Sequence, residues 1–136
     1  MVNSISVENL ARLCCEENVG LIHISSDYVF DGKNSNIKYL ETDLTNPINF
    51  YGITKLNGEK GILKHNPKKS IIIRTSWLYS ELKNNFVSVI LTKIRNREDI
   101  YVVNDEYGCP TNSMDLALTI LEIIPKLNDS GTEIFH

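Results

Sequence analysis

The chain has 136 residues, 42% of them hydrophobic, and a formal net charge of −3. This length predicts a single domain, residues 1–136, and the hydrophobic content excludes an intrinsically disordered chain. The acidic balance and the scattered basic residues argue against nucleic acid or an anionic membrane as the partner, and no apolar run approaches the roughly 18 residues of a membrane span.

Helices and strands alternate along the predicted chain. In chain order we expect a helix at 4–17, a buried strand at 21–25, a long polar loop at 31–49, a helix at 50–65, a strand at 70–75, a helix at 84–96, a short strand at 100–103, a helix at 112–124 and a last strand at 133–136. This alternation indicates the α/β class, as a partial Rossmann-like, doubly wound parallel sheet with flanking helices.

The helix expected at 84–96 is amphipathic, and its apolar stripe is predicted to face inward through Phe86, Val87, Ile90, Leu91 and Ile94.

Polar residues follow three of the predicted strands or strand-like segments. They are Ser25-Ser26, Ser76-Trp77 and Asn104-Asp105. Ligands of open α/β sheets bind beyond the carboxyl ends of the strands. The pattern therefore predicts a binding site where these three segments meet.

The residues Ser26, Tyr51 and Lys55 have the chemistry of a carbonyl-reducing site. A ketone that accepts a hydride needs a proton on its oxygen, which a tyrosine hydroxyl can donate. A lysine four residues later lies on the same helix face and favours the phenolate by its charge. A serine hydroxyl at a strand end can hydrogen-bond the same ketone oxygen.

Tyr-x-x-x-Lys is a weak signal alone, because Tyr79 and Lys83 fit it as well. Tyr51 follows the turn signal Asn46-Pro47 and opens a helical pattern, whereas Tyr79 follows a strand and precedes the polar segment SELKNN. We therefore assign the site to Tyr51 and expect Tyr79 to lie in a loop without a serine partner.

Cysteine and histidine residues give neither a disulfide framework nor the spacing of a zinc site. Cys14 and Cys15 are adjacent, and the third cysteine, Cys109, is distant in the sequence. We expect a reduced cytoplasmic protein with small buried thiols and no metal site.

Several strings together identify a family resemblance. ISSDYVFDG, NPINFYGITKLNGE, RTSWLY, NNF and NDEYGCPT occur in this order. They resemble the extended short-chain dehydrogenase/reductases, and within them the dTDP-4-dehydrorhamnose reductase family, over nearly the whole chain. The resemblance implies a reductase that transfers a hydride from NADPH or NADH to the C4 ketone of a dTDP-4-keto-6-deoxy sugar.

The resemblance also implies roles for individual residues. Ser26, Tyr51 and Lys55 would be catalytic, and Tyr51 and Lys55 would also bind the cofactor. The residues implied to bind the nucleotide-sugar substrate are Ser26, Asp27, Tyr28, Trp77 and Asn85. The segment around Asn3 is similar to the family's asparagine-containing helix, which would make Asn3 a structural member of the site.

Three of these substrate assignments have a purely structural alternative. Asp27 is also suited to capping a turn, Trp77 to filling the core beside a strand end, and Asn84 or Asn85 to capping the next helix.

Family members hold the cofactor pyrophosphate on a glycine-rich turn, and the seven glycines of this chain form no such motif. We therefore expect the chain to be the C-terminal part of an NAD(P)-binding domain with part of a substrate-binding region, and to be inactive alone. One alternative is a non-catalytic module similar to the β subunit of methionine adenosyltransferase. Others are an inert fragment that self-associates through an exposed sheet edge or helices, and a nucleotide-sugar epimerase.

Overall fold

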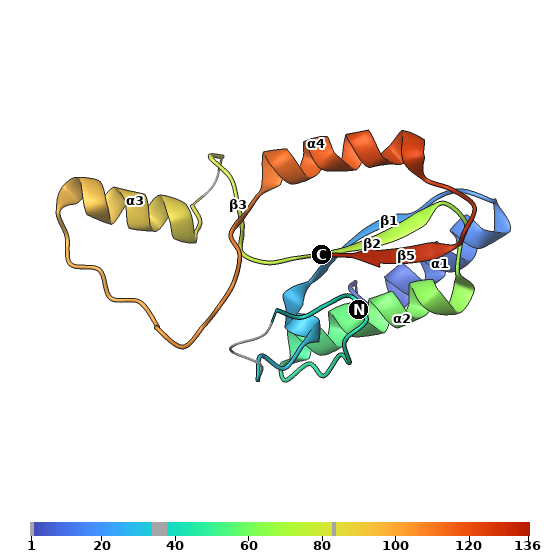
Figure 1. Cartoon of the computed structure of the whole chain (residues 1–136), viewed down its shortest axis with the longest axis horizontal. Coiled ribbons are helices and arrows are strands. Elements are labelled where there is room, and N and C mark those ends of the chain that lie inside the picture. Colours follow the sequence, from blue (N-terminus) through green and yellow to red (C-terminus); the bar gives the residue numbers. More distant parts are fainter. Residues whose placement is uncertain (1, 34–37, 83) are drawn as a thin grey trace. The chain divides into compact units, whose positions relative to one another are not determined.

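The computed structural model describes residues 2–33, 38–82 and 84–136 (Figure 1). They form two compact units. The first comprises Met1–Thr75 and Pro125–His136, and the second comprises Ser76–Ile124.

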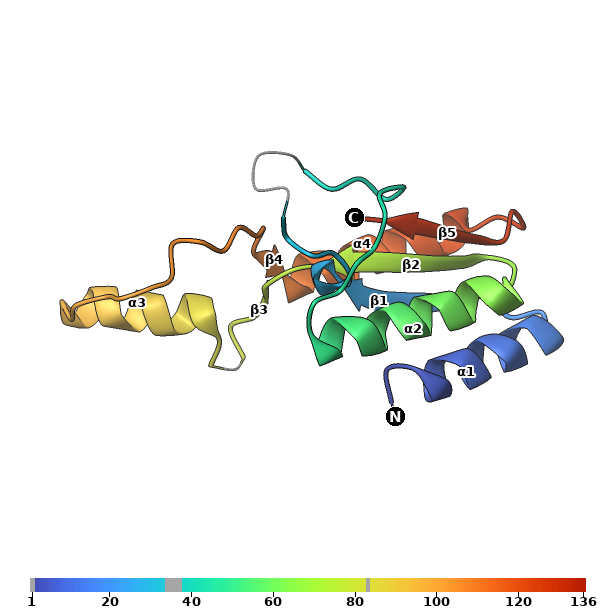
Figure 2. The same ribbon diagram turned by 90° about the horizontal axis from the view of Figure 1, so that it is seen from below.

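A parallel sheet covered by two helices forms the first unit. Its elements are α1 (Ile5–Glu16), β1 (Ile22–Ser26), the 3-10 turn η1 (Asp27–Val29), α2 (Phe50–His65), β2 (Ser70–Thr75) and β5 (Thr132–Phe135), and a second 3-10 turn, η2 (Ile124–Lys126), lies at the unit boundary. The strand order is β1-β2-β5, with both pairs parallel. Helices α1 and α2 lie side by side against one face of this sheet (Figures 1 and 2). The predicted α/β class with a parallel sheet is confirmed.

The core of the first unit lies between the sheet and the two helices. One cluster joins both layers and consists of Ala11, Cys14, Leu21, Ile62 and Ile72. Strand β1 is paired with β2 so that His23 lies opposite Ile72 and Ser25 lies opposite Arg74. Alternate residues of a strand point to the same face. Leu21 directly precedes β1 and lies in this core, so the same alternation directs His23 and Ser25 toward α2.

Glycines allow close packing on two sides of α2. A Cβ at Gly61 would lie 2.7 Å from Cβ of Glu8, so α1 can approach only because this position has no side chain. A Cβ at Gly52 would collide with the backbone carbonyl of Tyr28. The first turn of α2 is thus in contact with η1, directly after β1.

Asparagines fix both ends of α2, Asn49 by its side chain and Asn66 by its backbone. The Asn49 side chain accepts a hydrogen bond from the Gly52 amide at 2.7 Å, which satisfies a free donor of the first turn. At the other end Asn66 adopts a left-handed conformation, and its side chain accepts a hydrogen bond from the Thr132 amide at 2.8 Å. Asn66 therefore ends the helix and also positions the start of β5.

The second unit contains two short strands and two helices. Strand β3 (Leu78–Tyr79) pairs in parallel with β4 (Thr111–Asn112), and the helices are α3 (Phe86–Asn96) and α4 (Ser113–Ile123). Tyr79 thus lies in a two-residue strand and not in the loop that we expected, while Lys83 lies outside the described residues.

Two predictions for this unit are wrong. Residues 100–103 do not form a strand; they are exposed and irregular, because no described strand pairs with them. The first unit's sheet accordingly has three strands where four were expected. The apolar stripe of α3 is not buried either, since no described residue of that helix is buried and Phe86 is exposed. An amphipathic pattern specifies a face, and burial also requires a neighbouring element to cover it.

Candidate active site

The carboxyl end of β1 turns directly into η1, and Ser26 fixes this turn. Its buried hydroxyl donates to Asp27 Oδ1 at 3.0 Å and accepts from the Tyr28 amide at 3.2 Å. A hydroxyl has one donor and two acceptor lone pairs, so one acceptor position of Ser26 is left. Burial raises the pKa of Asp27 above its ordinary value, against the opposing effect of the hydrogen bond from Ser26.

Tyr51 lies in the first turn of α2, and its side chain is accessible. The residue is 47% exposed. Its ring meets the ring of Tyr28 edge-to-face, with centroids 5.9 Å apart. Contact between the two rings places the catalytic candidate beside the η1 segment that follows Ser26.

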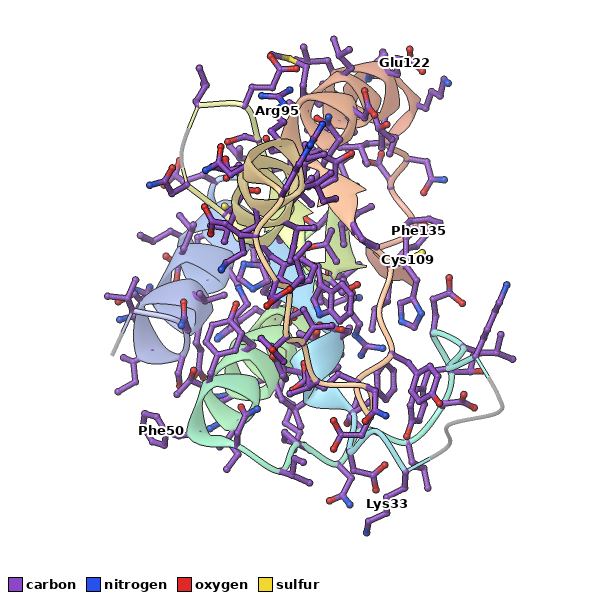
Figure 3. All side chains as sticks on the ribbon, turned by 90° about the vertical axis from the view of Figure 1, so that its left-hand side faces the viewer. Lys33, Phe50, Arg95, Cys109, Glu122 and Phe135 are labelled. Carbon is purple, nitrogen blue, oxygen red and sulfur yellow. The ribbon has the colours of Figure 1, made fainter. Side chains whose placement is uncertain are left out.

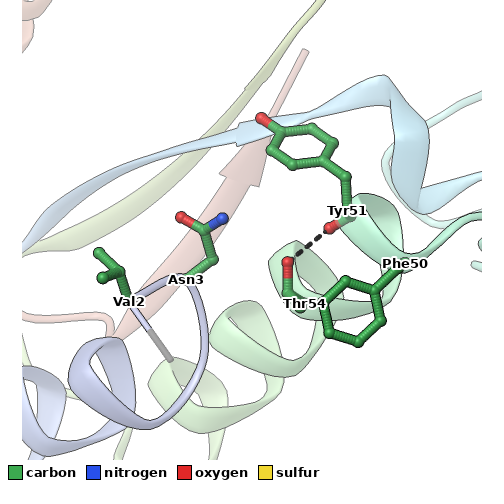
Figure 4. Close-up of a pocket in the computed structure, with 5 residues that line it drawn as sticks. All are labelled: Val2, Asn3, Phe50, Tyr51 and Thr54. Carbon is green, nitrogen blue, oxygen red and sulfur yellow. Dashed lines mark hydrogen bonds between the residues drawn. The ribbon is translucent and has the colours of Figure 1, made fainter.

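A pocket of about 260 Å³ lies between the turn before α1 and the start of α2 (Figure 4). Val2 and Asn3 line one side, and Phe50, Tyr51 and Thr54 line the other. Phe50 is 76% exposed and projects from the first turn of α2 (Figure 3). The residues that line this pocket include Tyr51 and Asn3 but neither Ser26 nor Lys55.

Lys55 lies one turn after Tyr51 and reaches back to β1. Its side chain is buried, and its ammonium donates a hydrogen bond to the backbone carbonyl of Ile24. Burial lowers the pKa of Lys55, and the negative charge of Glu59 opposes this effect. The Ile24 carbonyl precedes Ser26 by two residues, so Lys55 approaches the same strand end that carries Ser26.

A group of buried polar residues lies behind this site, and Ser25 is the one member of it that was predicted from the sequence. His23 Nε2 and Ser25 Oγ are buried without a hydrogen-bond partner among the described residues. Glu59 and Arg74 form a buried ion pair, 2.7 Å between Glu59 Oε2 and Arg74 Nη2. The sequence contained a signal for this ion pair: Arg74 interrupts the apolar strand SIIIRT, and Glu59 follows Lys55 by one helical turn.

Two of the expected substrate-binding residues, Trp77 and Asn85, lie in the second unit. Trp77 is 37% exposed and has a left-handed backbone, and a Cβ at Gly108 would lie 2.6 Å from its ring. The Ser76 hydroxyl donates to the Cys109 carbonyl at 2.8 Å and accepts from the Cys109 amide at 3.1 Å, which holds the Trp77 segment against the Gly108-Cys109 loop. Because of its exposure, Trp77 is not a core residue.

Asn85 is the N-cap of α3. Its side chain accepts from the Ser88 amide at 3.0 Å, and the Ser88 hydroxyl accepts from the Asn85 amide at 2.9 Å. This reciprocal pair is a capping box, so the structural alternative holds for Asn85. A role in substrate binding stays a prediction.

No cluster of three potential metal ligands occurs in the part of the chain that the structure describes. Within the same residues, every helix is too short or too polar to cross a membrane. Cys14 is buried as expected, whereas Cys15 and Cys109 are exposed thiols.

Comparison with known proteins identifies the family. A family model described as the RmlD substrate binding domain matches residues 1–136. The chain belongs to this family. The dTDP-4-dehydrorhamnose reductase of Aggregatibacter actinomycetemcomitans is 44% identical over 126 residues, which cover 93% of the chain and 42% of that protein. The dTDP-4-keto-6-deoxy-D-glucose reductase of Streptomyces niveus is 38% identical over 136 residues.

A solved structure shows the same fold. The dTDP-4-dehydrorhamnose reductase of Bacillus anthracis, crystallised in complex with NADP, superposes with a TM-score of 0.82 at 38% identity. The match covers 97% of this chain and 46% of that one. The Rossmann-like expectation is therefore confirmed, and this member of the RmlD substrate binding domain family spans less than half the length of the relatives it matches.

Proposed function

We propose that residues 1–136 are the C-terminal part of the NAD(P)H-binding domain, with part of the substrate-binding region, of a reductase that acts on a dTDP-4-keto-6-deoxy sugar. The observation that carries this proposal is that Tyr51 and Lys55 of α2 each contact the β1-η1 segment that contains Ser26. Ser26 ends the strand, Tyr51 touches the η1 segment through Tyr28, and Lys55 donates to the Ile24 carbonyl. The relatives named above are reductases of this chemical class.

Each of the three groups has a chemical part in this proposal. Tyr51 donates the proton that the ketone oxygen needs once its carbon has been reduced, and the exposure of its ring makes the hydroxyl accessible to substrate. Lys55 favours the phenolate of Tyr51 by its positive charge, from the same helix face. A ketone oxygen is an acceptor and needs a donor, and the single O–H of Ser26 donates to Asp27. To hydrogen-bond the substrate, Ser26 must therefore turn this O–H from Asp27 toward the ketone oxygen.

The residues present fit one end of a dinucleotide. The Lys55 ammonium has three donors and uses one on the Ile24 carbonyl, so donors remain for ribose hydroxyls, and Tyr51 borders an accessible pocket. A bound NADPH or NADH would supply the hydride. No glycine-rich turn for the pyrophosphate occurs in the sequence, so Tyr51 and Lys55 would hold only the nicotinamide ribose.

A chimera tests this function. Residues 1–136 replace the matching part of the Aggregatibacter actinomycetemcomitans reductase, and NADPH oxidation is measured with a dTDP-4-keto-6-deoxy sugar. We expect turnover, and we expect Tyr51→Phe to reduce kcat by about 10²–10⁴-fold, the usual contribution of a general acid. Tyr79→Phe is the matched control and should retain activity. Loss of turnover in Tyr79→Phe but not in Tyr51→Phe would show that the wrong tyrosine had been assigned.

A further inference from the structure

A buried ion pair lies next to Lys55, on the side of α2 that faces the sheet. Glu59 is 1% exposed and Arg74 of β2 is 6% exposed. Arg74 Nη2 donates to Glu59 Oε2 at 2.7 Å, and Arg74 Nε donates to Glu59 Oε1 at 3.0 Å. Two parallel hydrogen bonds of this kind fix the position and orientation of a carboxylate.

Arg74 is itself held from several directions. Its guanidinium lies 5.1 Å from the ring centre of Phe30, and its Nη1 lies 3.3 Å from His136 Nε2. Nη1 also donates a long hydrogen bond to the Glu41 carbonyl at 3.4 Å. A guanidinium restrained by α2, by His136 after β5 and by the segment after η1 cannot easily turn away from Glu59.

Lys55 precedes Glu59 by four residues, so the two side chains lie on one face of α2. Among the residues that the structure describes, none forms an ion pair with Lys55, whose ammonium is held by a neutral carbonyl. Burial lowers the pKa of an ammonium that has no opposite charge nearby. The fixed carboxylate of Glu59 counteracts this effect at Lys55.

The other groups that face Lys55 do not supply this charge. His23 on β1 is neutral at pH 7, because burial, with a smaller effect of the Lys55 charge, lowers its pKa to about 4. Asp27 bonds to Ser26 in η1, and burial raises its pKa. Arg74 on β2 is a cation. Glu59 is thus the buried anion that acts on Lys55 in the described part of the molecule.

We propose that Glu59 is a positioning residue of the site: held by Arg74, its carboxylate keeps the Lys55 ammonium charged and directed at the carboxyl end of β1. The proposal rests on the role of Lys55 in the proposed function. A charged Lys55 is the form that favours the Tyr51 phenolate and donates to a ribose. The buried pair would therefore serve the chemistry of the site in addition to joining α2 to β2.

The test is a direct titration of Lys55, by NMR of its side-chain nitrogen in the folded chain of 136 residues. We expect Lys55 to lose its proton at a lower pH in Glu59→Gln than in the wild type. Glu8→Gln is the matched control, because Glu8 of α1 forms an ion pair with Lys64 in the last turn of α2 at 2.7 Å, away from the site. It should leave the titration of Lys55 unchanged.

A double variant covers the case in which Glu59→Gln does not fold. Glu59→Leu with Arg74→Met replaces the pair by apolar residues of similar volume, an exchange that buried ion pairs often tolerate. Lys55 should again titrate at a lower pH. An unchanged Lys55 titration in either folded variant would overturn the proposal. Because no turnover is measured, failure of the chimera to reduce its substrate would refute the proposed function and leave this result standing.

Discussion

At the scale of single residues, burial determines the charge of the polar side chains behind the site. Lys55 and His23 are cationic acids whose pKa values burial lowers, and Asp27 is a carboxylic acid whose pKa burial raises. In all three the neutral form is favoured, as expected where a charged group loses its hydration. The negative charge of Glu59 opposes this effect at both His23 and Lys55, and Lys55 is the one of the two that belongs to the expected catalytic group.

His23 makes the stability of the fold depend on pH. Its pKa falls from 6.5 to about 4 on folding, so between these values the unfolded chain binds a proton at His23 that the folded chain does not bind. The free energy of unfolding should therefore decrease as the pH falls from 6.5 toward 4, by on the order of 2 kcal/mol. In His23→Gln, which does not titrate, urea unfolding over this pH range should show a shallower decrease. A decrease as steep as that of the wild type would contradict the assignment.

At the scale of elements, α2 combines a packing role with a functional one. Its glycines let α1 and η1 approach, while Tyr51 and Lys55 face the end of β1. The position of the site relative to the strand therefore depends on how closely the helix approaches η1. Gly52 sets this distance, since its missing side chain leaves room for the Tyr28 carbonyl.

Gly52→Ala should destabilise the first unit. Alanine is the better helix former by about 0.5–1 kcal/mol, but a Cβ at this position would collide with backbone, which cannot rotate away as a side chain can. We expect the clash to dominate and the free energy of unfolding to fall by about 1–3 kcal/mol, as for other overpacked sites. Chemical denaturation measures the change. Asn57→Ala, on the exposed side of the same helix, should change stability by less than about 0.5 kcal/mol.

At the scale of the whole molecule, the chain divides into two compact units with different parts of the expected chemistry. The first contains Ser26, Tyr51 and Lys55, and the second contains Trp77 and Asn85. Neither contains a glycine-rich phosphate turn. Under the proposed function, the chain would thus have some of the groups for a nucleotide sugar and only a fraction of those for a dinucleotide.

Calorimetric titration of the 136-residue chain should show different affinities for NADPH and for dTDP. Charge-assisted hydrogen bonds contribute about 1.5–3 kcal/mol each, so the loss of two pyrophosphate contacts would weaken NADPH binding by about 100-fold or more. We expect no measurable NADPH binding and weak dTDP binding. NADPH binding at micromolar concentration would refute this expectation.

The sequence by itself determined the fold class, the family and the motif residues. Apolar runs such as SIIIRT indicate a buried parallel strand without reference to partners, and the turn signal Asn46-Pro47 precedes the start of α2. The serine and the Tyr-x-x-x-Lys motif could also be linked from local sequence alone. They lie on consecutive elements of the chain, β1, η1 and α2.

Only the tertiary structure decided which apolar faces are covered and which charges meet. Periodicity predicted an inward face for α3 and a strand at 100–103, but burial and pairing need a partner element that local sequence does not specify. The ion pair of Glu59 with Arg74 joins residues 15 positions apart, and it forms because α2 packs against the sheet that contains β2. Long-range contacts of this kind depend on the packing of whole elements, and so the group that controls the charge of Lys55 became visible only in the fold.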